Sequence, residues 1–309
     1  MRSIGAGVAT ALLALILPFA TSAQNGLERF EAELKPRFEL KQFTCASGTP
    51  LGNSGFVLND VVATIPANPA TGDKESTIKI QKATIEALDF DRLKKDAKTD
   101  EAPRFAKLKL DGVTGNDEIF TALQPFGVPN VPFDIALDYR LDPAAKVLDL
   151  EILEVALRGQ AKIALSLVVD NVSDKISEVA GTKDDGRLRT AALTLDDTGL
   201  LAKLLSAWAK EEGVTPEELV QTALAGLAAF AAQQSPPTLK ALDAVASFLV
   251  DWKAPKGPLV LAVKPAKTAG LSDLDKIMVP DALTEEFGFD ATYPGTRPGT
   301  AKTGASGRK

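Results

Sequence analysis

The sequence predicts an α+β fold in which an extended, bulged antiparallel sheet packs on about three helices. Apolar and polar residues alternate along most of the chain between residues 38 and 195, which is the pattern of strands with one buried face. The connections between the strands of residues 132–170 are short, and short connections force antiparallel pairing. After Leu195 the apolar spacing changes to that of helices.

The first part of the chain is expected to supply one short helix and most of the sheet. Residues 26–35 have helical spacing, and Pro36 ends that helix. The Gly-containing stretch 47–55 is interpreted as a turn, and residues 117–123 as a short helix. Strands are expected at residues 38–45, 56–65, 77–88, 106–111, 133–141, 148–157, 163–169 and 190–195.

Two of these strands change the side on which their apolar residues fall. The alternation slips at Lys82, and it slips again between Ile152 and Leu153. One residue of slip reverses the two faces of a strand, so a β-bulge or a bend is predicted at each place. Residues 132–170 then form a three-strand meander with one apolar and one charged face.

Three helices are expected next. Asp196 and Asp197 can cap a helix that Gly213 ends. Thr215 and Glu218 form a capping box for a helix over 219–232, which is apolar nearly all round and is therefore expected to be buried. The third helix covers 235–252, followed by a strand at 259–263 and a helical segment at 273–286.

The N-terminus has the three parts of a secretory signal peptide. Arg2 is basic, an uncharged apolar stretch follows, and small residues precede a cleavage point after Ala23 or after Ser22. The alternative, an uncleaved anchor, needs a longer apolar stretch of roughly 20 residues. We therefore expect a signal peptide at 1–23, a single α+β domain at 24–293, a disordered basic tail at 294–309, and a periplasmic location.

The composition excludes several kinds of chemistry. The chain has no histidine and a single cysteine, so Ser-His-Asp triads, imidazole metal sites and thiolate zinc cages within one chain are impossible. Cys45 is expected to be a buried strand residue, with a reactive or intermolecular thiol as the alternative. The net charge of −6 disfavours nucleic acid as a partner. No cofactor is expected.

Two sets of residues still suggest an active site. Ser76 with Lys79 and the sequence at 302–304 match S-x-x-K and K-T-G, but the first lies on an expected strand and the second in the tail, where those motifs do not function. Four carboxylate pairs are interpreted as solvated loop charges or, for the third, as a helix cap: Asp89/Asp91, Asp184/Asp185, Asp196/Asp197 and Asp273/Asp275. No catalytic, cofactor, metal or ligand residue is therefore assigned.

The strands over 105–113, 133–141 and 159–167 resemble those of AsmA-like envelope proteins and of uncharacterised periplasmic proteins of proteobacteria. Residues 193–200 and 213–218 are similar to helical inserts in such proteins, and the resemblance covers about residues 77–227. It implies envelope maintenance or lipid handling and supplies no catalytic motif.

The leading hypothesis is a non-enzymatic periplasmic envelope protein that binds a lipid or another apolar ligand between its sheet and its helices. After signal cleavage no transmembrane helix is expected, and the partner is a lipid or an envelope protein. The first alternative is a structural or partner-binding module with a filled core. The second is an enzyme that uses carboxylates.

Overall fold

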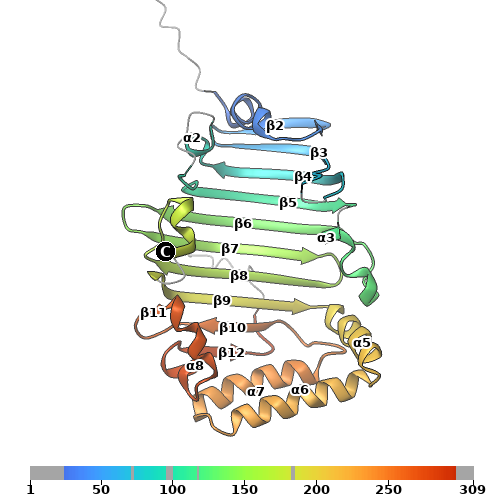
Figure 1. The fold of residues 1–309 in the computed structure, drawn as a ribbon, viewed down its shortest axis with the longest axis vertical. Coiled ribbons are helices and arrows are strands. Elements are labelled where there is room, and N and C mark those ends of the chain that lie inside the picture. The colour runs from blue at the N-terminus through green and yellow to red at the C-terminus, as the bar shows by residue number, and fades with distance from the viewer. Residues whose placement is uncertain (1–23, 71–72, 95–99, 117, 182–184, 297–309) are drawn as a thin grey trace, which may run out of the picture.

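The computed structural model describes residues 24–70, 73–94, 100–116, 118–181 and 185–296. Its main feature is a single twelve-stranded antiparallel sheet whose path runs β1-β3-β4-β5-β6-β7-β8-β9-β10-β12, with β2 also pairing with β3 and β11 with β9. Strands that neighbour each other in the sequence are neighbours in space along most of this path (Figure 1). The antiparallel α+β class predicted from the alternation is confirmed.

Most expected strands form close to their predicted bounds. The described strands are β1 Gln42–Thr44, β2 Ser47–Leu51, β3 Gly55–Ile65, β4 Ser76–Leu88, β5 Phe105–Gly115, β6 Phe133–Asp142, β7 Val147–Leu157, β8 Ala161–Asp170, β9 Arg187–Asp197, β10 Leu259–Val263, β11 Ala269–Gly270 and β12 Phe289–Thr292. The expected turn at 47–55 is wrong, because β2 occupies most of it and only the residues between Leu51 and Gly55 turn. An uncharged segment with Gly and Pro can still pair at a sheet edge, where one side of the strand needs no partner.

The predicted slip at Lys82 is a kink shared by neighbouring strands. Asp60 of β3, Gln81 of β4 and Gly112 of β5 have no pairing partner among the described strands, although the register is the same on both sides of them, and Asp60 and Gly112 have positive φ angles of 51° and 66°. Side chains on both sides of the kink, Leu58 and Val61 among them, still pack in one core cluster. In all three strands the alternation of faces therefore shifts by one residue at the same place. The pairing of β3, β4 and β5 keeps one register across Lys82.

The second predicted slip is a bulge in β7. The register with β6 shifts between Asp138 and Tyr139, which leaves Glu151 without a partner, and the register with β8 shifts between Leu150 and Leu153. The prediction of a bulge at Ile152 and Leu153 is confirmed to within two residues. Beyond it, Leu150 and Leu148 return to the same face as Leu153.

The longer helical segments lie at the two ends of the sheet, and α3 (Glu118–Thr121) lies beside the strand ends between them (Figure 1). At the β3 end, α1 Gly26–Arg29 continues into a π-turn at Phe30–Leu34 (η1) and a 3₁₀ turn at Lys35–Arg37 (η2). At the β12 end, the long helices are α5 Leu200–Glu212, α6 Pro216–Ala231 and α7 Pro236–Val250. Short helices are α2 Phe90–Leu93, α3 Glu118–Thr121 and α8 Ala282–Glu285, with 3₁₀ turns η3 Gln124–Phe126, η4 Ile176–Gly181 and η5 Leu271–Met278.

The expected caps form, but two expectations about the helices are wrong. Thr215 and Glu218 make the predicted capping box, and Gly213 ends α5 in the left-handed conformation. The number of helices in the described residues exceeds three, because short helices join the strands. Helix α6 is not enclosed: Val220 is its buried residue, and its exposed positions after Thr222 are alanines and one glycine. Alanine side chains are apolar but expose little area, so an alanine-rich helix can lie at the surface although its composition predicts burial.

Cys45 is exposed rather than buried. It lies between β1 and β2 at the outer edge of the sheet, where no further strand of the described residues covers it. The signal-peptide prediction for 1–23 and most of the tail prediction lie outside the described residues. In the part of the chain that the structure describes, no helix is long and apolar enough to cross a membrane.

Candidate functional site: an open aliphatic sheet face

One face of the sheet carries two continuous rows of apolar side chains that run across the strands. Residues paired directly across an antiparallel ladder point to the same face. From β3 to β10 the first row is Leu58, Ala83, Leu110, Ile135, Val155, Ile163, Leu195 and Leu259, and the second is Phe56, Ile85, Leu108, Leu137, Leu153, Leu165, Leu193 and Leu261. We call the part of these rows on β5 to β10 the aliphatic face.

The centre of the aliphatic face is open. Ile163 is 45% exposed, Val155 39%, Leu153 38% and Leu193 36%. Val155 lies directly opposite Ile163, and Leu153 and Leu193 flank Leu165 from the two sides. An apolar sheet face is normally covered by a second layer, so four adjacent exposed aliphatic side chains form an apolar patch of the kind that interaction sites show.

The two ends of the sheet close this face. At one end Phe30 and Leu34 of η1 pack on β3 and β4 in a cluster that reaches Leu110. At the other end α7 contacts β12, where the ring of Phe248 meets that of Tyr293 edge-on at 5.4 Å. Leu259 and Ala291, which lie on the same face, are buried there.

The two sets of strand ends also carry covering residues. Phe120 of α3 packs edge-on against Phe133 at the start of β6, with ring centroids 5.8 Å apart. At the opposite strand ends, Ala102 and Leu271 pack against a cluster that includes Val169. The aliphatic face is therefore exposed at its centre and covered by packed residues around its margins.

The opposite face of the same strands is polar. Lys107 of β5 pairs with Asp138 of β6 at 3.0 Å, and Lys162 of β8 pairs with Glu154 of β7 at the same distance. The lysines of these pairs are 47% and 40% exposed and the carboxylates 13% and 21%, so both pairs still reach solvent and contribute about 1 kcal/mol or less each. The lysines on this face reach solvent, whereas smaller residues between them, Ala164 and Thr194, are buried, so this face is polar at its surface and the other face is apolar.

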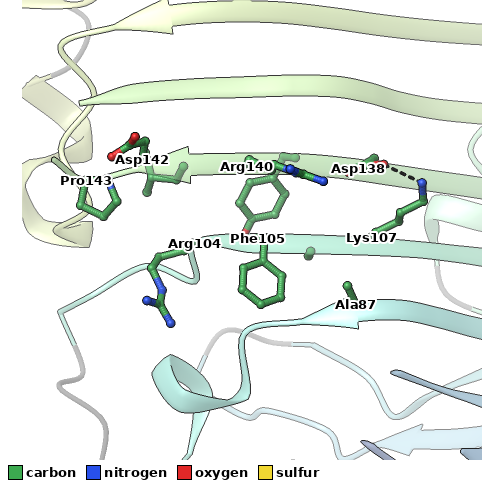
Figure 2. A pocket seen from close by; sticks show the side chains of 11 residues that line it. Ala87, Arg104, Phe105, Lys107, Asp138, Arg140, Asp142 and Pro143 are labelled. Atoms are coloured by element: carbon green, nitrogen blue, oxygen red, sulfur yellow. Dashed lines mark ion pairs between the residues drawn. The ribbon is translucent and has the colours of Figure 1, made fainter. Parts of the chain in front are cut away.

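A pocket of about 620 Å³ lies on the polar face between β5 and β6 (Figure 2). Phe105 and Ala87 supply its apolar wall, and Arg104, Lys107 and Arg140 supply its cations. Lys107 is engaged by Asp138, as the dashed line in Figure 2 shows.

Arg104 is engaged as well, by the buried carboxylate of Asp89. The guanidinium Nε donates to Oδ2 at 2.7 Å, Nη2 donates to Oδ1 at 3.1 Å, and the Arg104 backbone N–H donates to Oδ2 at 3.0 Å. Burial alone raises the pKa of Asp89, but these hydrogen bonds outweigh it and hold the pKa below its usual value. Both side chains support the start of β5, and the pocket shows no arrangement of nucleophile and base.

Several of the carboxylates singled out in the sequence have structural roles. Asp89 is buried and ion-paired, which contradicts the expectation of a solvated loop charge. Asp197 accepts hydrogen bonds from the backbone of Gly199 and Leu201, so it caps the start of α5 as predicted. Asp91 and Asp273 form ion pairs with basic neighbours. Asp184 lies outside the described residues.

The other chemical motifs do not assemble a site. Ser76 is buried at the start of β4, and Lys79 is exposed further along the same strand, so S-x-x-K lies on a strand as predicted. Residues 302–304 lie outside the described part. Within the residues that the structure describes, no three or more carboxylate or cysteine side chains gather to hold a metal ion.

Comparison with known proteins adds one finding. A family model whose description is "Uncharacterized protein" matches residues 153–294, from the second half of β7 through β12. No curated protein matches the chain. The matched region contains β8, β9 and β10, half of the aliphatic face, together with the three long helices.

Proposed function

We propose that this protein is a non-enzymatic lipid-binding protein that holds acyl chains on its aliphatic face. The observation that carries the proposal is the set of exposed side chains at the centre of the face, Leu153, Val155, Ile163 and Leu193. Exposure of apolar surface to water is unfavourable, and a bound hydrocarbon would lower the free energy by removing that surface from water. The ligand position differs from our initial hypothesis, because it lies on the sheet beside the helices rather than between the two.

The dimensions of the face suit an acyl chain. Neighbouring strands are about 4.8 Å apart, so the rows from β5 to β10 extend about 24 Å. One leaflet of a bilayer core, which an acyl chain spans, is about 15 Å thick. A chain lying along a row would therefore contact side chains from three or four strands, and two rows side by side offer room for two chains.

The chemistry of the rows favours an acyl chain over a protein partner. From β5 to β10 both rows consist of Leu, Ile and Val alone. Protein interfaces draw most of their affinity from Trp, Tyr and Arg, and these rows contain none of them. Branched aliphatic side chains have no preferred polar contact, which suits a flexible hydrocarbon.

The resemblance to AsmA-like proteins points to the same function. The segments that carry it, 105–113, 133–141 and 159–167, correspond to β5, β6 and β8, which are three of the six strands of the aliphatic face. We further propose that residues 1–23 direct the chain to the periplasm, where a lipid ligand would be met at the envelope.

The test is extraction and rebinding. Organic solvent extraction of the purified protein, followed by mass spectrometry, is expected to release a lipid at near one molecule per chain. The delipidated protein is then expected to bind a fluorescent long-chain fatty acid, and Ile163→Asp is expected to abolish most of that binding. A clean extract together with no binding of the fatty acid by the delipidated protein would overturn the proposal.

A further inference from the structure

The outer edge of the sheet is one long strand rather than two short ones. β1 pairs with β3 through Gln42↔Thr64 and Thr44↔Val62, and β2 pairs with it from Ser47↔Asn59 to Leu51↔Gly55. Both sets of pairs follow one continuous register. The break at Cys45 and Ala46 lies opposite Asp60, at the kink that β3, β4 and β5 share. The edge therefore extends over residues 42–51, a length comparable to that of the central strands.

This edge lacks the charges that usually protect against pairing, and although α1 contacts β2, its Leu27 packs on the sheet face beside Gly48 and leaves the strand exposed. Residues 42–59 contain no charged side chain, and residues 42–51 are exposed except for Phe43, which is half-buried. Natural edge strands commonly carry lysine, are very short or lie under other elements. The opposite edge follows that rule because β12 covers only Phe289–Thr292 and is therefore short.

We propose that the edge formed by residues 42–49 pairs antiparallel with the same edge of a second copy of this chain. Antiparallel pairing of a strand with itself obeys a two-fold axis, which is the commonest symmetry of protein dimers. A charged strand would place like charges opposite one another in such a pair, and this strand has none to oppose it. The two sheets then join into one.

Pro50 limits the region that pairs. A proline offers no backbone N–H and is tolerated at an edge where its nitrogen faces away from the sheet. Pro50 pairs with Phe56 of β3, so its nitrogen leaves a gap in any ladder added outside. The useful part of the edge is therefore residues 42–49, whose middle is close to Cys45.

Cys45 provides a probe of the register in which the two edges pair. A two-fold axis near the middle of the pairing segment brings the two Cys45 residues opposite each other. Directly opposed residues of an antiparallel pair have Cα atoms about 4.5–5.5 Å apart, which is within the range that a disulfide spans. The dimer depends on the strand, and the thiol serves only as a probe of its register.

The experiment measures mass and cross-linking with the full-length chain. Light scattering over increasing protein concentration is expected to show a mass that approaches twice that of the monomer. Thr44→Lys and Thr49→Lys add a charge to an exposed position on each copy, so we expect either to weaken dimerisation more than tenfold. Thr292→Lys is the matched control, because it makes the same change at an exposed position of the β12 edge.

Oxidation tests the register. Under mild oxidant the native protein is expected to form a Cys45-linked dimer, whereas Cys45→Ser is expected to remain dimeric by light scattering. A protein that stays monomeric at all concentrations would overturn the proposal, and so would dimers that Thr44→Lys and Thr49→Lys leave intact. A dimer that never cross-links at Cys45 would overturn the register centred on that residue.

Discussion

Ile163→Asp tests whether the aliphatic face binds hydrocarbon. Burying a Leu, Ile or Val side chain completely contributes about 1.5–3 kcal/mol. Ile163 is 45% exposed, so a ligand that covers it gains about 0.7–1.4 kcal/mol from this side chain. The aspartate removes that gain and leaves a carboxylate beneath the ligand, which costs at least about 1–3 kcal/mol more. The expected sum is about 2 kcal/mol or more, a rise in Kd of about 30-fold or more.

The assay is equilibrium titration of the delipidated protein with a fluorescent long-chain fatty acid, alongside urea unfolding of each variant. Ile65→Asp is the matched control, because Ile65 is 39% exposed and lies at the end of β3, away from the aliphatic face. Both substitutions remove an exposed strand isoleucine, so we expect similar changes in the free energy of unfolding, about 1 kcal/mol or less. If Ile163→Asp binds within threefold of wild type, or if Ile65→Asp weakens binding as much, the face does not hold the ligand.

Three further predictions concern stability. Phe90 is 1% exposed in the cluster at the β3 end, so Phe90→Ala is expected to lower the free energy of unfolding by about 3–5 kcal/mol in urea titrations. Asp89 has a pKa held below its usual value by Arg104, against the opposing effect of burial. Its ionised form therefore adds stability above the unfolded-state pKa of about 3.9, and that stability is lost as the pH falls through the folded-state pKa. Asp89→Asn should accordingly cost more at pH 7 than at pH 3 when unfolding is measured at both, and an equal cost at the two pH values would contradict this origin. Gly112→Ala should destabilise by about 1–3 kcal/mol in thermal melts, because φ is +66° and an added Cβ would lie 2.3 Å from the side chain of Gln81; a neutral effect would show that the kink relaxes.

The strands were predictable because each carries its own signal. Alternation reports which residues of a strand share a face, and both parity changes in the sequence mark real irregularities at Gln81 and Glu151. The form of the irregularity was not predictable. A shared kink and a bulge give the same one-residue slip in a single strand, and only the neighbouring strands distinguish them.

Burial was harder to predict, because it depends on what covers a residue. Cys45 has apolar and small neighbours in the sequence but lies on an edge with no described strand outside it. Helix α6 has an apolar composition but places its alanines at the surface. The residue type gives the tendency of a side chain to leave water. Whether it is buried depends on covering residues that are distant in the sequence.

The aliphatic face could not be located from the sequence for the same reason, because its exposure depends on where the covering elements lie. The charged and apolar sides of residues 132–170 were evident, and ordinary folding would hide the apolar side under helices. The covering elements gather instead over β3 and β4, over β12 and at the strand ends. They bury enough apolar surface to stabilise both ends of the sheet and leave the middle strands as a single layer held by their backbone ladders. Helices laid across Val155 and Ile163 would have buried more apolar area, so the open centre lowers stability relative to a closed sandwich. Proteins often give up stability at their functional sites. The cost of leaving this centre exposed therefore supports the proposal that it binds a ligand.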